Sequence, residues 1–151
     1  MWFRYIGVPC FLYLIRPNIS MKMSTQRDFF RYRSVYRKNF KRNKEYTGYV
    51  EDHHIIPKQW KHHELMEILN FDVHCSKNLY IMPNTRAKYR FYLHPSTMIH
   101  TGGHRKYNDY VKEQLDYILG LDKESQKYNF WLLLHHLKSN MKFNKDNVPW
   151  K

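Results

Sequence analysis

With 151 residues, of which 42% are hydrophobic, the chain is long enough to form one compact domain, which excludes wholesale disorder. The formal net charge of +13 and the pI of about 9.7 cause self-repulsion that is tolerated most easily beside a polyanion. Nucleic acid is therefore the first candidate partner and an acidic membrane surface the second. Aromatic residues make up 17% of the chain, so several rings are expected on the surface.

The two cysteines, Cys10 and Cys75, are far apart and form no CxxC pair. This spacing excludes a disulfide framework and a thiolate zinc knuckle. A reducing, intracellular location is expected, either the cytoplasm or the site of the DNA.

Residues 1–23 form an apolar N-terminal extension whose role the sequence leaves open. The apolar run 6–15 has some features of a signal peptide, but it contains Pro9, lacks a small-residue cleavage site and is too short to span a bilayer. We therefore expect no stable membrane association. Met21 and Met23 are alternative starts to the first methionine.

The segment 24–46 is strongly basic and is predicted to form a helix with Ser24 or Thr25 as its cap. Its lysines and arginines alternate with aromatic rings, which suits an arm that contacts phosphates and stacks on bases. A solvated helix face above a core stripe explains the same pattern equally well. Apolar residues recur at loosely helical spacing, at Phe29, Phe30, Val35, Tyr36 and Phe40.

The segment 47–119 is predicted to be the core of the domain. Gly48 is expected to break the basic helix, and residues 49–56 to form a strand that ends before a proline. A short helix over 58–69 follows.

A second strand is predicted over 78–82 and ends at another proline. Residues 84–99 are expected to be irregular. A helix is predicted over 102–119, with Gly120 as its stop signal.

The segment 120–151 is predicted to pack on this core through a last helix over 123–142. The core face of that helix is assigned to Trp131, Leu132, Leu134 and Leu137. The expected fold class is α+β, in the order strand, strand, helix, with helical flanks.

Eight of the ten histidines lie between positions 53 and 104, far more than an even scatter would place there. Neutral imidazole is the commonest ligand for transition metals, and its pKa also suits a general base. His100 and His104 are four residues apart, a spacing that places both on one face of a helix. Because the intervening glycines disfavour a helix interior, His100 is expected just before the helix with Thr101 capping it, and His104 in the first turn.

Three segments in order, EDHHIIP at 51–57, NLYIMP at 78–83 and HTGGHRKYN at 100–108, resemble the HNH (ββα-metal) endonuclease superfamily and are closest to its AHH-type subfamily. The resemblance covers roughly residues 50–115 and implies a ββα-metal core with a basic N-terminal helix and C-terminal helices. It implies that one divalent ion is held by three residues, and that further residues act in catalysis. The metal ligands would be His53, His100 and His104. His54 would be the general base, and Asn78 would orient it. Arg105 would clamp the phosphate, with Lys106 or Arg86 as substitutes.

This sequence departs from the subfamily in two places. Asp52 stands where the subfamily has alanine, and it could join or support the metal. The stretch between Asn78 and His100 is longer than in compact HNH sites. A further difficulty is that His53 and His54 should point to opposite faces of a strand, so they can serve one site only where the strand ends or bulges.

The resemblance implies metal-dependent hydrolysis of phosphodiester bonds, with DNA as the expected substrate and Mg, Mn, Zn or Ni as the ion. The alternative is an inactive nucleic-acid-binding module that keeps the metal for its fold. Composition and size favour a free-standing nuclease of a virus or mobile element over a toxin module. A second metal site made of His62, His63 and Cys75 fits no common ligand spacing. The remaining histidines are therefore interpreted as surface residues; they are His62, His63, His74, His94, His135 and His136.

Overall fold

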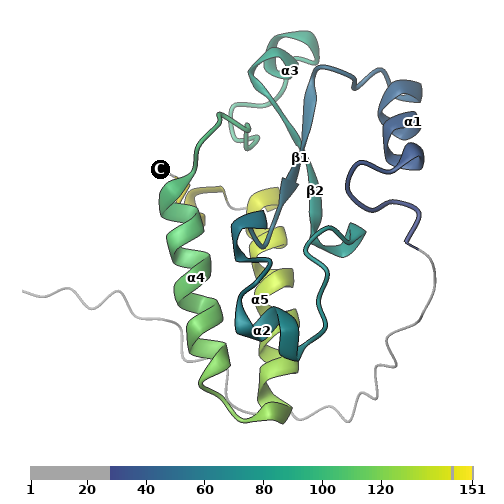
Figure 1. The fold of residues 1–151 in the computed structure, drawn as a ribbon. Helices are drawn as coiled ribbons and strands as arrows, with labels where there is room; N and C mark the ends of the chain where they lie inside the picture. Colours follow the sequence, from purple (N-terminus) through teal and green to yellow (C-terminus); the bar gives the residue numbers. More distant parts are fainter. Residues whose placement is uncertain (1–27, 144, 151) are drawn as a thin grey trace, which may run out of the picture.

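The computed structural model describes residues 28–143 and 145–150 (Figure 1). A two-stranded sheet and its short connecting helices lie beside a pair of long helices, α4 and α5. The fold class is therefore α+β, as predicted. The predicted apolar extension 1–23 and the predicted caps Ser24 and Thr25 lie outside the described residues.

The basic segment is helical over a shorter range than predicted, because α1 spans only Val35–Asn43. Ser34 caps this helix, and its side-chain oxygen accepts a hydrogen bond from the Arg37 backbone N–H at 3.2 Å. Before the helix the chain runs in turns, since the Asp28 carboxylate accepts the backbone N–H groups of Phe30 and Ser76. The helix also ends five residues before Gly48, whose φ of +83° places it in the turn that leads to the first strand.

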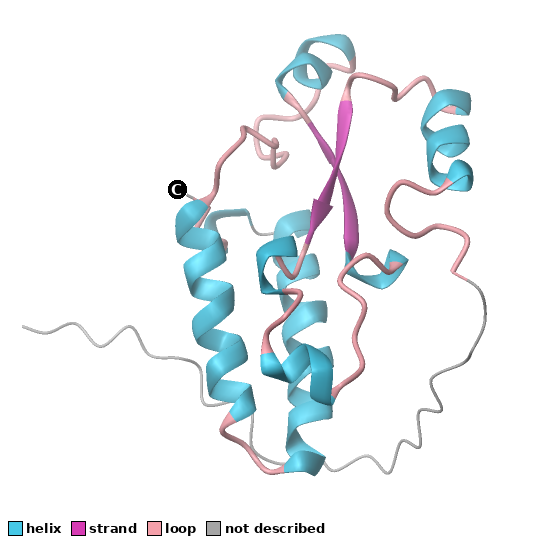
Figure 2. Ribbon diagram, in the orientation of Figure 1, coloured by secondary structure: helices cyan, strands magenta, loops and turns pink. Residues whose placement is uncertain are grey.

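The sheet is an antiparallel pair, β1 (Val50–His54) and β2 (Leu79–Pro83). Figure 2 shows the two strands crossing with a strong twist. The register pairs His53 with Tyr80 and His54 with Leu79. Both predicted strands are confirmed, although β1 is shorter than 49–56 and β2 is shifted by one residue.

The connection between the strands is broken into short pieces, so the predicted continuous helix over 58–69 is wrong. A single 3-10 turn, η1 (Lys58–Trp60), is followed by α2 (Glu64–Ile68). His63 interrupts the run because its backbone is extended and its Nδ1 accepts the Leu65 backbone N–H, which makes it the cap of α2. A second 3-10 turn, η2 (Ser76–Asn78), leads into β2.

The region predicted to be irregular contains a further helix, α3 (Thr85–Arg90). Asn84 starts it by accepting the backbone N–H groups of Arg86 and Ala87 with its side-chain oxygen. A six-residue helix is too short for hydrophobic periodicity to reveal it.

The long helices are α4 (Arg105–Leu119) and α5 (Lys123–Phe143), and η3 (Lys145–Asn147) follows them. Gly120 ends α4 as predicted, but α4 begins three residues later than expected because Gly102 has a φ of +93°. In α5 the predicted core residues Leu134 and Leu137 are buried, whereas Leu132 is 37% exposed. The core face of α5 also includes three residues that were not predicted, namely Phe130, Leu133 and Met141.

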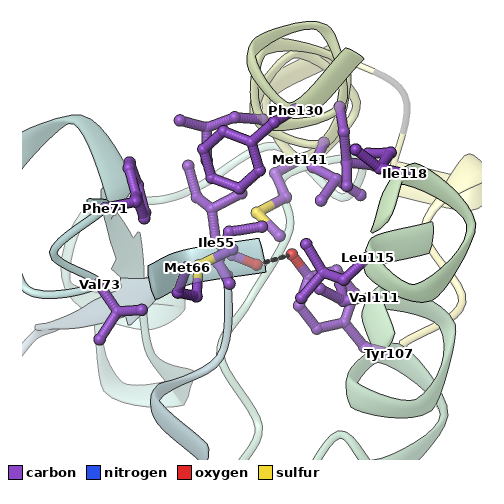
Figure 3. Close-up of a cluster of buried hydrophobic side chains, with 14 of the residues drawn as sticks. Ile55, Met66, Phe71, Val73, Tyr107, Val111, Leu115, Ile118, Phe130 and Met141 are labelled. Carbon is purple, nitrogen blue, oxygen red and sulfur yellow. Dashed lines mark hydrogen bonds between the residues drawn. The ribbon is translucent and has the colours of Figure 1, made fainter. Parts of the chain in front are cut away.

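The core lies between the end of β1 and the two long helices, as Figure 3 shows. Ile55 follows β1 directly, is fully buried, and accepts a hydrogen bond on its carbonyl from the Tyr107 hydroxyl of α4. This bond ties the end of β1 to α4 inside the hydrophobic core. None of the described helices is both long and apolar enough to cross a membrane.

Replacing Asn78 with alanine should destabilise the fold. The buried Asn78 amide accepts the Ile56 N–H at 2.7 Å and donates to the carbonyls of Ile56 and Val73, so alanine leaves three buried backbone groups without partners. We expect the free energy of unfolding to fall by about 3 kcal/mol in urea titrations. Asn129→Ala, which removes a hydrogen bond within one helix, is the matched control. A loss no larger than that of the control would contradict the bracing role of Asn78.

Candidate metal centre

Three histidines from separate segments converge on one point. His53 lies on β1, His100 lies in the loop that precedes α4, and His104 is the N-cap residue of α4. One possible ligand atom from each ring lies within 4.8 Å of the others, so a single ion can reach all three. This is the one such group among the described residues, and it contains the three histidines predicted as ligands.

The backbone brings His100 to the site through the sheet and not through α4. Its N–H donates to the carbonyl of Pro83 at 2.8 Å, and His100 forms a bridge with Asn84 at the end of β2. His100 precedes α4 as expected, but the expectations that Thr101 caps this helix, that His104 lies in its first turn and that both rings share one helix face are wrong. The positive φ of Gly102 turns the chain between the two rings, and His104 becomes the N-cap residue.

The His53 ring has the chemistry of a ligand that lacks its partner. Its side chain is buried, and its Nε2 has no hydrogen-bond partner. Burial, together with the neighbouring His104 and His100, lowers the pKa of His53 to about 3. The imidazole is thus held neutral, which is the form that binds a cation.

The other two rings are oriented by polar neighbours. The His104 Nδ1–H donates to the Oδ1 of Asn108 at 3.0 Å, which leaves Nε2 free for a metal. The Nδ1 of His100 lies 3.0 Å from a carboxylate oxygen of Glu51, without the alignment of a hydrogen bond. Burial lowers the pKa of His100 and Glu51 opposes this shift. The donor set and its supporting groups therefore fit a divalent ion.

Two aromatic rings enclose the three histidines. The Trp150 ring centroid lies 5.0 Å from that of His53, 5.9 Å from that of His100 and 4.5 Å from that of His104. Tyr107 lies behind His53 and is fully buried. Tyr107 is part of the motif that identified the site. Trp150 was missed, because nothing in its local sequence links it to a histidine motif fifty residues earlier.

His54 lies on the other side of β1, away from this group. Its Nε2 is 3.1 Å from the Nδ1 of His74, and Tyr32 packs edge-on against it at 4.6 Å. Burial, and after it the neighbouring His74, lowers the pKa of His54 to about 4. The structure thus places His54 as the last residue of β1 with a histidine partner, and the interpretation of His74 as a surface residue is wrong.

Asp52 shares the face of His54 and makes no approach to the three histidines. Its carboxylate accepts hydrogen bonds from Arg37 at 2.7 Å and from Lys41 at 2.9 Å. Burial alone raises the pKa of Asp52, but these two cations hold it below its ordinary value. The expectation that Asp52 joins or supports the metal is therefore wrong, because α1 supplies its partners.

An open hollow of about 320 Å³ adjoins Asp52 between α1 and β1. Tyr32, which contacts His54, lines it together with Arg33 and Lys38. Cations thus gather on the His54 side of the strand. The remaining lining residues are Arg37, Lys41, Val50, Glu51 and Asp52.

The other predicted catalytic residues occupy distinct environments. Asn78 is buried and holds the segment after His54 through both backbone groups of Ile56. Arg105 is the first residue of α4, its side chain is 95% exposed, and it lies 3.7 Å from Asp109. Neither residue touches the three histidines. Lys106 and Arg86 are also exposed.

The remaining histidines follow the surface interpretation with one further exception. The His63 side chain is only 8% exposed and lies 2.9 Å from a carboxylate oxygen of Asp116. His62, His94, His135 and His136 are exposed as predicted. Cys75 carries a free thiol and joins no metal-binding group within the described part of the chain.

The chain matches the model of a known nuclease family. The family model described as AHH, a nuclease family of the HNH/ENDO VII superfamily with conserved AHH, matches residues 35–130, which is more than half of the chain. The conserved AHH resembles Asp52-His53-His54 here, where the carboxylate that binds α1 stands in place of the alanine. Neither curated proteins nor solved structures match the chain.

Asp52→Ala should weaken the fold without weakening metal binding. The variant leaves the guanidinium of Arg37 buried with no countercharge, and we expect the free energy of unfolding to fall by about 3 kcal/mol. Calorimetric titration with Ni²⁺ should give an unchanged affinity. Asp109→Ala, which removes an exposed ion pair, is the control and should change neither quantity. A drop in Ni²⁺ affinity for folded Asp52→Ala alone would return Asp52 to the metal site.

Trp150→Ala should loosen the metal site, because the indole packs against all three imidazoles. We expect the affinity for Ni²⁺ to fall about tenfold, as for other residues that orient ligands. Trp150→Phe keeps an aromatic ring and should retain most of the affinity. Equal Ni²⁺ affinities of the alanine variant and the unmodified protein would show that Trp150 does not orient the three imidazoles.

Proposed function

Since this chain belongs to the AHH family, a nuclease family of the HNH/ENDO VII superfamily, we propose that it is an intracellular, metal-dependent endonuclease that hydrolyses phosphodiester bonds of DNA. The observation that carries the proposal is the convergence of His53, His100 and His104, with the buried Nε2 of His53 left without a partner. Within this proposal β1, β2 and α4 form a ββα-metal core, and α2 and α3 are insertions between its parts.

The three histidines would hold one divalent ion, of which Zn, Ni, Mn and Mg are the candidates. When bound, the ion supplies a Lewis acid for the phosphate and for the leaving oxygen. Asn108 fixes the ring of His104, and Trp150 restricts the movement of all three rings. The protein thus contributes a preformed set of neutral donors.

His54 would act as the general base that removes a proton from the attacking water. It is adjacent to His53 at the end of β1, so a phosphodiester that crosses the end of the strand can face both side chains. In the tautomer in which its Nε2–H donates to His74, the lone pair on Nδ1 of His54 is free to accept the proton. A bound phosphate would raise the pKa of His54 from its low value, since a negative charge stabilises imidazolium.

Asn78 and Arg105 complete the proposed mechanism. Asn78 fixes the backbone two residues after His54 and so acts as a positioning residue. Arg105 is the first residue of α4, next to His104, where its guanidinium can donate two parallel hydrogen bonds to a phosphate group. On the other side of β1, Arg33 and Lys38 can hold the substrate backbone near His54.

The decisive experiment is plasmid cleavage by the purified protein with EDTA, Mg²⁺, Mn²⁺, Ni²⁺ or Zn²⁺, beside the variant His54→Ala. We expect nicking only with a metal, and a loss of at least about a hundredfold in the variant, as for removal of a general base. Ni²⁺ affinity should be unchanged, because His54 faces away from the three ligands. His135→Ala, at an exposed position of α5, is the matched control.

Two results would overturn this proposal. Loss of both cleavage and Ni²⁺ binding in folded His54→Ala would remove its assignment as the base. No cleavage with any metal, together with salt-sensitive DNA binding, would instead favour a metal-stabilised binding module.

A further inference from the structure

The segment between the second strand and α4 has an unusual charge. No aspartate or glutamate occurs from Val73 to Asn108, whereas the same stretch contains six cations, Lys77, Arg86, Lys88, Arg90, Arg105 and Lys106. Helix α3 lies inside this segment and exposes three cations, Arg86, Lys88 and Arg90. Arg90 alone of these has an acidic group near it, at 3.9 Å from Glu45. This part of the surface is therefore strongly positive and has little internal compensation.

Two tyrosines stand out from the same surface. Tyr89 is 73% exposed and Tyr92 is 93% exposed. They are the two most exposed large hydrophobic side chains in the described part of the chain, and both leave a ring face open to solvent. Tyr92 also has a φ of +49°, a left-handed conformation that a non-glycine residue adopts at a cost. The turn is held by a hydrogen bond from the Leu93 N–H to the Lys88 carbonyl, so the outward position of Tyr92 is built into the backbone.

Helix α3 is fixed to the core through its opposite side. Ala87 is fully buried, and the Phe91 ring packs against Tyr46 and Tyr49 at centroid distances of 5.9 and 5.3 Å. Asn84 donates from its side chain to the Gly48 carbonyl at 3.1 Å. The exposed cations and rings are thus presented by an anchored helix and not by a loose loop.

Asn84 also links α3 to the candidate metal centre. Asn84, the cap of α3, forms the bridge with His100, one of the three converging histidines. Figure 1 shows α3 at the far end of the hairpin, away from the layer of α4 and α5. A strand of nucleic acid that leaves the proposed cleavage site past His100 would reach this surface.

We propose that α3 and the turn after it bind an unpaired stretch of the nucleic acid that flanks the cleaved bond. The α3 surface consists of Arg86, Lys88, Tyr89 and Tyr92. Its cations would hold phosphates, and its tyrosine rings would stack on bases. Stacking requires a free base face, which a duplex conceals and a single strand offers. This inference rests on the proposed nuclease function, but it concerns binding and can be tested without cleavage.

The test is fluorescence anisotropy in EDTA with a labelled single-stranded oligonucleotide and with the matching duplex. The double variant Tyr89→Ala/Tyr92→Asn removes both rings, and asparagine tolerates the left-handed backbone at position 92. We expect single-strand binding to weaken about tenfold or more, and duplex binding to change less than about twofold. Tyr89→Phe/Tyr92→Phe keeps both ring faces and should restore the unmodified affinity.

Two controls separate stacking from charge and from misfolding. Tyr117 on α4 is 59% exposed and Tyr128 on α5 is 44% exposed. The variant Tyr117→Ala/Tyr128→Ala removes both rings and should leave the affinities for single strand and duplex unchanged. Arg86→Ala/Lys88→Ala should weaken binding to both oligonucleotides and reduce the salt dependence by about two charges.

The inference is overturned if the double tyrosine variant binds single strand as tightly as the unmodified protein, or if it loses single-strand and duplex affinity equally. Unchanged oligonucleotide binding with weakened binding to vesicles of anionic lipid would assign the surface to a membrane and also overturn it. Failure of plasmid cleavage would leave these results intact, because no binding measurement uses a metal.

Discussion

The hydrogen bonds of the Asn78 side chain are the interaction on which the site depends. They fix both backbone groups of Ile56, two residues beyond β1, to Asn78, the residue directly before β2. The preceding residue, Ile55, accepts the hydroxyl of Tyr107 from α4. One amide thus sets where β1 ends and how α4 meets the sheet. His53 lies on β1 and His104 is the N-cap residue of α4. The distance between these two rings therefore depends on the same bonds.

The alternation of side chains along β1 then divides the neighbourhood into two chemical faces. His53 points to the neutral imidazoles and the indole of Trp150, where burial favours metal ligands over charged groups. Asp52 and His54 point to the opposite face, where α1 supplies cations. This division explains why a carboxylate can replace the alanine of the family triplet without entering the metal centre. Its charge is compensated by Arg37 and Lys41, one of which is itself buried.

The sequence predicted the parts of this arrangement that are local in the chain. The two strands and the end of α4 at Gly120 followed from spacing and residue type, whereas the grouping of His53, His100 and His104, which joins distant segments, followed from the resemblance to the nuclease family. Predictions failed where a side chain accepts backbone N–H groups and so sets the start of a helix. His63 and Asn84 each start a helix by accepting backbone N–H groups, which split one predicted helix and created another. No periodic pattern records such bonds.

A different limit applies to contacts between distant segments. His74 reaches His54, and Trp150 reaches all three converging histidines, only because of how the whole chain folds. Trp150 lies beyond the residues 35–130 that match the family, so the match carries no information about it. Helix α5 brings it there, since the chain passes down α4, returns along α5 and ends beside the residue from which α4 started. The helical pair therefore contributes to the candidate site indirectly, by returning the chain so that Trp150 packs against all three histidines.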